Sequence, residues 1–159
     1  MWQEVTTTLI SEFADLPDAA ETTRVLVRLL MAALFGGVLG YEREHRGKAA
    51  GLRTHMLVAM GAALFVMVPE RAGMHISDMS RVIQGVVAGV GFLGAGAIIK
   101  RHSEEDVEGL TTAAGIWMTA AIGVTCGLGK GGTALLGTLF ALLILALIPH
   151  ISAPPKSNS

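Results

Sequence analysis

Five apolar stretches, separated by short polar segments, follow one another along the chain. They run over residues 25–41, 54–68, 82–99, 111–128 and 133–151. A membrane-crossing helix takes about 20 mainly apolar residues, with about 17 as the usual lower limit, so the second stretch is short. Backbone groups in lipid have to be paired within their own segment, and none of the stretches alternates like a strand. The pattern therefore predicts an all-α, polytopic transmembrane bundle of about five short helices.

Composition supports a membrane protein and narrows its chemistry. Hydrophobic residues make up 52% of the chain and charged residues 16%, against about 25% charged in an average soluble domain. The net charge of -1 provides no basic excess, so we expect no nucleic-acid partner. The single cysteine, Cys126, is expected to be a buried packing residue. Loops this short offer no place for a catalytic Ser, His and Asp arrangement, so we do not expect an enzyme.

The charges along the chain predict its organisation and its orientation in the bilayer. Residues 1–23 are acidic, contain no lysine or arginine and so lack the basic start of a cleavable signal peptide. We expect them to be an extracytoplasmic segment before a transmembrane domain at 24–151, with 152–159 as a disordered cytoplasmic tail. Basic residues near the ends of the stretches favour the cytoplasmic side. Seven lie on one side (Arg43, Arg46, Lys48, Arg53, Lys100, Arg101 and Lys156) and three on the other (Arg71, Arg81 and Lys130). This bias predicts an outside N-terminus and a cytoplasmic C-terminus.

Glycines spaced four apart lie within three of the stretches. The pairs are Gly36 and Gly40, Gly85 and Gly89, and Gly123 and Gly127, and the third stretch continues with Gly91, Gly94 and Gly96. Such pairs make a smooth helix face on which another backbone can pack closely. Packing within the monomer, a dimer interface and a locally unwound ion-binding segment all fit this pattern. The density of small residues predicts that the third stretch is the central helix.

Charged residues gather at the predicted cytoplasmic end of the first stretch. On a continuing helix Glu42 would pair with Arg46, and Glu44 with Lys48, in the favourable acid-first order. Alternatively, Glu42 lies at the membrane boundary and needs Arg43, Arg53 or a cation as partner. A carboxylate there could bind a proton or Mg²⁺. The acidic residues at 104–106 and 108 also suit Mg²⁺, although a solvated loop is the more common role of such a cluster.

Two polar residues lie inside predicted spans near their outer ends. Arg28 is expected to reach the lipid headgroups or to pair with Glu21. Gln84 is expected to bond to another helix rather than to a substrate.

Four motifs, taken together, resemble the MgtC/SapB family of bacterial inner-membrane proteins. They are Gly-Gly-Val-Leu-Gly-Tyr-Glu-Arg-Glu at 36–44, Gly-Leu-Arg-Thr-His at 51–55, the glycine-rich run 89–100, and Gly-Leu-Thr-Thr-Ala-Ala at 109–114 followed by Trp117. The resemblance covers about residues 24–147. It implies a multi-pass domain of four or five helices, tied to growth and virulence under magnesium limitation. It also implies regulation of other membrane machinery, such as the ATP synthase or a cation transporter. Well-known members carry a further soluble domain, so we expect a short, membrane-only branch.

Three hypotheses about function follow, the last of which is a pure assembly or scaffold role. The first is a non-enzymatic regulator, homo-oligomeric through its small-residue faces, that contacts a partner through residues 42–53 and 100–112. The second is a channel or carrier for Mg²⁺ or protons that uses Glu42, Gln84 and an opened segment at 91–96. We expect no cofactor, apart from the Mg²⁺ considered above. The candidate contact residues are Glu42, Arg43, Glu44, Arg53, Thr54, Gln84, Lys100, Thr111 and Thr112.

Overall fold

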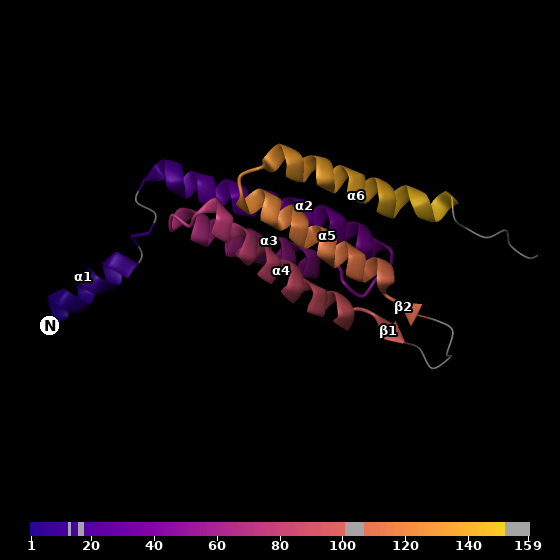
Figure 1. Ribbon diagram of the computed structural model, residues 1–159, viewed down its shortest axis with the longest axis horizontal. Helices are drawn as coiled ribbons and strands as arrows, with labels where there is room; N and C mark the ends of the chain where they lie inside the picture. The colour runs from indigo at the N-terminus through magenta and orange to yellow at the C-terminus, as the bar shows by residue number, and fades with distance from the viewer. Residues whose placement is uncertain (13, 16–17, 101–106, 152–159) are drawn as a thin grey trace, which may run out of the picture.

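The computed structural model describes residues 1–12, 14–15, 18–100 and 107–151, and this part of the chain is a helical bundle (Figure 1). Its helices are α1 (Trp2–Glu12), α2 (Ala19–His45), α3 (Leu52–Arg71), α4 (Ile76–Gly96), α5 (Leu110–Gly127) and α6 (Gly131–Ile151). A small antiparallel pair joins β1 (Ile99–Lys100) to β2 (Val107–Glu108) between α4 and α5. The predicted all-α bundle is confirmed.

Four helices, α2 to α5, are long and apolar enough to cross a membrane by length and composition. In α6 the stretch Gly131–Ala146 is a shorter apolar helix. Each of the five apolar stretches of the sequence therefore corresponds to one helix. We treat the chain as a membrane protein.

The helix ends differ from the predicted ones. The second stretch was predicted to end at residue 68, but α3 continues through Pro69 to Arg71, although proline lacks the backbone N–H of a helical hydrogen bond. His75 is the N-cap of α4, so this helix begins before the predicted stretch at 82–99. α5 begins at Leu110, and its N-cap Gly109 has a φ of 95°, a left-handed conformation that favours glycine.

The centre of the bundle consists of α2, α3 and α5. Small residues let these helices approach closely: a Cβ on Gly36 would lie 2.6 Å from the carbonyl oxygen of His55. A Cβ on Gly127 would lie 2.5 Å from the carbonyl oxygen of Ala63, and one on Gly40 would lie 2.7 Å from the Cα of Leu52. Two of the three glycine pairs therefore pack within the monomer.

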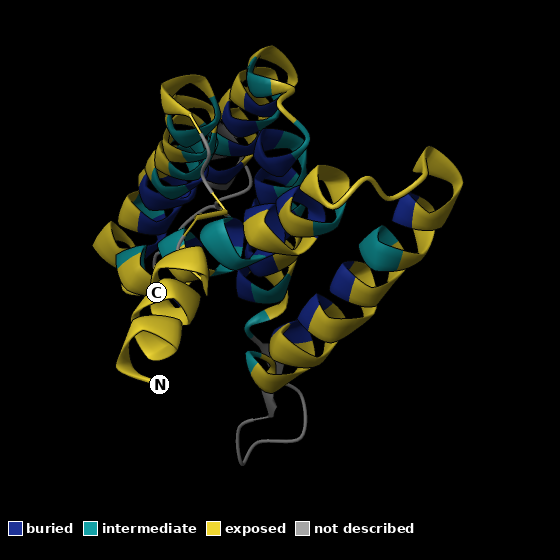
Figure 2. Cartoon of the chain, turned by 90° about the vertical axis from the view of Figure 1, so that its left-hand side faces the viewer, coloured by how far each residue is buried: buried dark blue, intermediate teal, exposed yellow. Residues whose placement is uncertain are grey.

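The prediction that the third stretch is central was wrong. Among the described residues α4 has four buried residues, whereas α5 has nine. A Cβ on Gly85, Gly89, Gly91 or Gly96 would meet nothing within 4 Å, and only Gly94 of this run faces a neighbour, Ala113 of α5. Most glycines of α4 therefore have no close neighbour, and Gly85 and Gly89 line an open groove between α4 and α3. Figure 2 shows the buried residues on the facing sides of the helices.

The two outermost helices are attached differently. In α6 the buried residues Ala134, Thr138, Ala141 and Leu145 recur every three or four positions, as expected for one helix face turned toward its neighbours. This face packs against α2 and α5. In contrast, α1 has no buried residue and extends away from the bundle in Figure 1.

Candidate functional site

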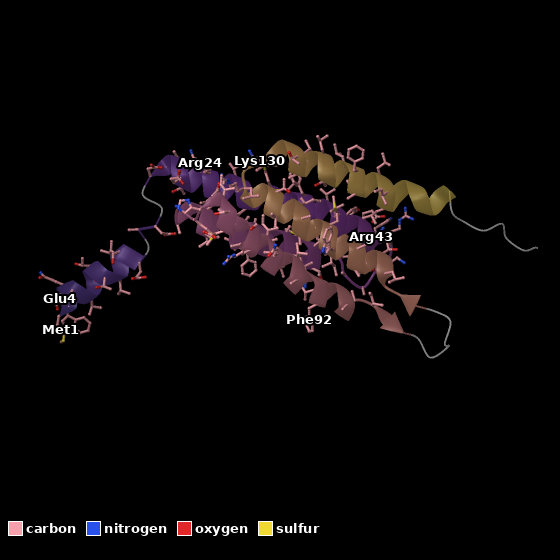
Figure 3. All side chains as sticks on the ribbon, viewed as in Figure 1. Met1, Glu4, Arg24, Arg43, Phe92 and Lys130 are labelled. Atoms are coloured by element: carbon pink, nitrogen blue, oxygen red, sulfur yellow. The ribbon has the colours of Figure 1, made fainter. Side chains whose placement is uncertain are left out.

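Charged side chains mark the two ends of the bundle. Figure 3 shows Arg43 at one end and Arg24 and Lys130 at the other. Close contacts place the end of α2 and the starts of α3 and α5 together, because His55 lies against both Gly40 and Gly115. We call the end that carries residues 42–55 the charged end. It is the end predicted to be cytoplasmic.

Glu42 is held between two arginines at the charged end. Arg43 Nε lies 2.5 Å from Glu42 Oε2, and Arg46 Nε lies 3.0 Å from Glu42 Oε1. The expected pairing of Glu42 with Arg46, four residues apart, is confirmed, and so is Arg43 as a partner. Both carboxylate oxygens are therefore occupied, one by an arginine of α2 and one by the C-cap residue of the same helix.

The same two arginines join α2 to the last turns of α6. Arg43 is only 2% exposed, and its Nη2 donates to the carbonyl oxygen of Leu145 at 3.5 Å. Arg46 Nη2 donates to the carbonyl oxygen of Ala146 at 3.2 Å. Carbonyls near a helix C-terminus carry partial negative charge, which cations stabilise. Glu42, Arg43 and Arg46 therefore form one network between two helices, with Arg43 buried and Arg46 at its exposed edge.

Glu44 has a different role from the predicted one. The pair with Lys48 was wrong, because α2 ends at His45 and Gly47 then turns the backbone with a φ of 66°. Instead, Glu44 Oε2 accepts a hydrogen bond from the backbone N–H of Leu52 at 2.8 Å. That N–H opens α3 and has no partner within its helix. Glu44 thus fixes the start of α3 on the end of α2.

The other predicted contact residues are spread over the molecule. Arg53 and Thr54 are exposed at the start of α3, and Thr111 is exposed at the start of α5, where Thr112 is buried. Gln84 is exposed on α4, away from the charged end. The side chains of Lys100 and of the acidic residues at 104–106 and 108 lie outside the described part. Within the described residues, no group of three His, Cys, Asp or Glu side chains could hold a metal ion.

Two buried polar residues in the bundle core were missed by the sequence reasoning. His55 and Thr119 are both 0% exposed. His55 Nδ1 lies 3.0 Å from the carbonyl oxygen of Gly51, but His55 Nε2 and Thr119 Oγ1 have no hydrogen-bond partner among the described residues. A signal was available, since ionisable residues inside membrane spans are rare and face the bundle interior.

At the opposite end, Arg28 joins three helices. Its Nη1 lies 2.5 Å from Glu70 Oε2 of α3 and donates to the carbonyl oxygen of Gly127 of α5 at 2.7 Å. The expected pair of Arg28 with Glu21 was wrong, because Glu21 instead pairs with Arg24, one turn away on the same helix. The expected reach of Arg28 to the lipid headgroups stays a prediction. Through Glu70 and Gly127, Arg28 fixes the outer ends of the central helices.

Comparisons with known proteins agree with this architecture. The MgtC family model matches residues 29–153. SrpB of Synechococcus elongatus is 52% identical over 130 residues, which cover 75% of this chain and 71% of SrpB. YhiD of Escherichia coli is 43% identical over 138 residues, or 82% of this chain and 63% of YhiD. The MgtC protein of Brucella abortus is 45% identical over 117 residues, or 74% of this chain and 48% of that protein.

This chain thus spans about half to two thirds of the length of several relatives. No solved structure matches it. The family match covers most of the chain and includes the charged end, the buried His55 and the packed glycines. The chain belongs to the MgtC family.

Proposed function

We propose that this protein is a non-enzymatic regulator in the bacterial inner membrane, which acts under magnesium limitation by binding another membrane protein through its charged end. The observation that supports this is the arrangement of cations there. Neither Lys48 nor Arg53 forms an ion pair with a described residue, and both side chains are exposed. Such cations are available to an acidic partner surface, for example one on an ATP synthase or a cation transporter.

The rigid base of this surface supports the proposal. Glu42, Arg43 and Arg46 connect α2 to α6, and Glu44 connects α2 to α3. Exposed residues on a fixed framework lose little conformational freedom when a partner binds. The network also satisfies the Glu42 carboxylate internally, so this residue contributes to the shape of the surface rather than to ion capture.

A co-purification experiment tests the regulator proposal. Partners captured by the parent protein from membranes are compared with those captured by Lys48→Ala and Arg53→Ala variants, alone and together. Arg81→Ala is the matched control, because Arg81 is exposed on α4 and forms no ion pair with a described residue. We expect the double variant to lose a specific partner that the control retains. Retention of every partner by the double variant would reject the proposal.

A second candidate function is transport of Mg²⁺ or protons. The name of YhiD provisionally assigns that relative to magnesium transport. The buried polar side chains of His55 and Thr119 are the feature of this chain that favours transport over regulation. The purified protein in liposomes decides between the two, because a carrier gives Mg²⁺ or proton flux above that of empty vesicles. Absence of flux under every imposed gradient removes this candidate.

The proposed regulator includes a second copy of the chain. The glycine face of α4 is open, and Gln84 on the same helix carries both a donor and an acceptor. An amide can pair with its own copy across a two-fold axis, and glycines let the two helices approach. Gly85→Leu is expected to abolish cross-linked dimers in membranes, whereas Leu136→Ala on the exposed face of α6 leaves them intact.

A further inference from the structure

At the interface between α3 and α5, glycines of α5 pack against successive positions of α3. Going outward from the charged end, Gly115 faces His55, and then Gly123 faces Ala59. The last contact joins Gly127 to Ala63. Thr119 lies between the first two of these contacts and is buried. It therefore faces the part of α3 between His55 and Ala59.

The ring of His55 has a defined hydrogen-bonding state. Its Nδ1 lies 3.0 Å from the carbonyl oxygen of Gly51, and a carbonyl can only accept. Nδ1 therefore donates, and in the neutral ring Nε2 is left as an acceptor. Nε2 is buried and has no partner among the described residues. A buried acceptor without a partner is costly, and inside a membrane no bulk solvent can satisfy it.

Gly115 leaves room beside this acceptor. A Cβ at Gly115 would meet His55 Nε2 at 3.5 Å and no other atom within 4 Å. Side chains on a helix tilt toward its N-terminus, so the Thr119 side chain leans along α5 toward Gly115, one turn before it. The acceptor nitrogen thus lies against Gly115, and the Thr119 hydroxyl lies on the same face of α5, one turn further along.

We propose that His55 Nε2, Gly115 and Thr119 Oγ1 form a binding site for one water molecule inside the bundle. Water donates to Nε2 and bonds to the hydroxyl, which matches the two unsatisfied atoms. Buried waters typically make about three hydrogen bonds to otherwise unpaired polar groups. A metal cation fits less well, because Glu42 is occupied by Arg43 and Arg46 and no cluster of metal-binding side chains occurs in the described residues.

The site is tested by solid-state NMR on the full chain in lipid bilayers, with ¹⁵N-labelled histidine rings. The His55 signal is identified by its loss in a His55→Gln variant. We expect a neutral ring protonated at Nδ1, with magnetisation transfer from water to Nε2. Thr119→Val keeps the shape of the side chain and removes the hydroxyl, so the water transfer is expected to fall.

The Gly115→Ala variant tests directly whether the space beside His55 Nε2 is needed for the water. Its new methyl group would lie 3.5 Å from His55 Nε2, an ordinary contact, and would take up space beside the acceptor that the proposed water needs. We expect loss of the water transfer while the helices remain folded. Gly89→Ala is the control, since its methyl group meets nothing within 4 Å, and it is expected to keep the transfer.

Three results would overturn the inference. One is a parent protein without water transfer to the His55 ring, as a direct bond between His55 and Thr119 would give. The second is water transfer that persists unchanged in both the Gly115 and the Thr119 variants. The third is displacement of the ring signal by added Mg²⁺ or Zn²⁺, which would identify the site as a metal site. If Gly115→Ala does not fold, the Thr119→Val comparison decides.

Discussion

At the scale of single residues, Arg43 is the side chain whose loss is expected to lower the stability of the bundle most. It is buried, lies 2.5 Å from Glu42 and reaches the Leu145 carbonyl oxygen of α6. Removing one partner of a buried ion pair costs about 3–5 kcal/mol, because the other charge is left uncompensated. Since Arg46 also pairs with Glu42, we expect Arg43→Ala to lower the free energy of unfolding by about 3 kcal/mol, the low end of that range.

Chemical unfolding in mixed micelles measures this loss. Arg53→Ala is the control, since Arg53 is exposed and a surface substitution usually changes stability by less than about 0.5 kcal/mol. Equal effects of the two substitutions would contradict a stabilising role for the network of Glu42, Arg43 and Arg46.

Sequence distance decides which of these side-chain pairs could be predicted. The pair of Glu42 and Arg46 follows from a four-residue spacing on one helix, and the structure contains it. The pair of Arg28 and Glu70 joins residues 42 positions apart and depends on how α2 and α3 align. No local pattern encodes that alignment. For the same reason His55 could be recognised as unusual in an apolar stretch, but its neighbours Gly115 and Gly40 could not be named.

The ion pair between Arg28 and Glu70 stabilises the outer end of the bundle. Arg28 and Glu70 are partly exposed, with side-chain exposures of 16% and 39%, so solvent screens their attraction. A double-mutant cycle with Arg28→Ala and Glu70→Ala is expected to give a coupling of about 1 kcal/mol or less. Arg28→Ala alone is expected to cost more than Glu70→Ala, because Arg28 also bonds to the Gly127 carbonyl oxygen. A larger loss for Glu70→Ala would show that this carbonyl contact contributes little.

At the scale of helices, glycine spacing predicts close packing only where the face is turned inward. A Cβ on Gly36 would lie 2.6 Å from the His55 carbonyl oxygen and 2.8 Å from Ala59 Cβ, so α2 and α3 would have to separate. We expect Gly36→Ala to destabilise the bundle by about 1–3 kcal/mol, as overpacking does. Gly89→Ala meets nothing and is expected to be neutral or to stabilise by up to about 1 kcal/mol. Thermal unfolding of the two variants in the same detergent checks the difference in sign.

The same comparison shows the limit of sequence reasoning about elements. The helices could be predicted because lipid forces each apolar run to pair its own backbone. The central helix could not, because Gly36 with Gly40 and Gly85 with Gly89 have identical spacing. They differ in which way each helix is rotated within the bundle, and that depends on all its neighbours. The N-cap of α5 could not be predicted for a related reason, since the left-handed Gly109 belongs to the turn that follows β2.

At the scale of the whole molecule, the fold brings the basic residues that bias the predicted orientation to one end of the bundle. Glu44 joins the end of α2 to the start of α3, and Arg46 joins it to the last turns of α6. The basic residues at 43–53 therefore share one end of the bundle with the C-terminal turns of α6, while Arg24 and Lys130 lie at the other end (Figure 3). Basic residues are retained on the cytoplasmic side, so this arrangement predicts that residues 43–53 are cytoplasmic.

Cysteine labelling tests this orientation. The native Cys126 is buried and is not expected to react, so single cysteines can be added to the parent chain. His75→Cys lies in the exposed connection between α3 and α4, and Lys48→Cys lies between α2 and α3. A membrane-impermeant maleimide should label His75→Cys in intact spheroplasts and Lys48→Cys only after lysis. The reverse pattern would place the charged end outside the cell, where it could not act on a cytoplasmic face, and would contradict both the predicted orientation and the proposed contact surface.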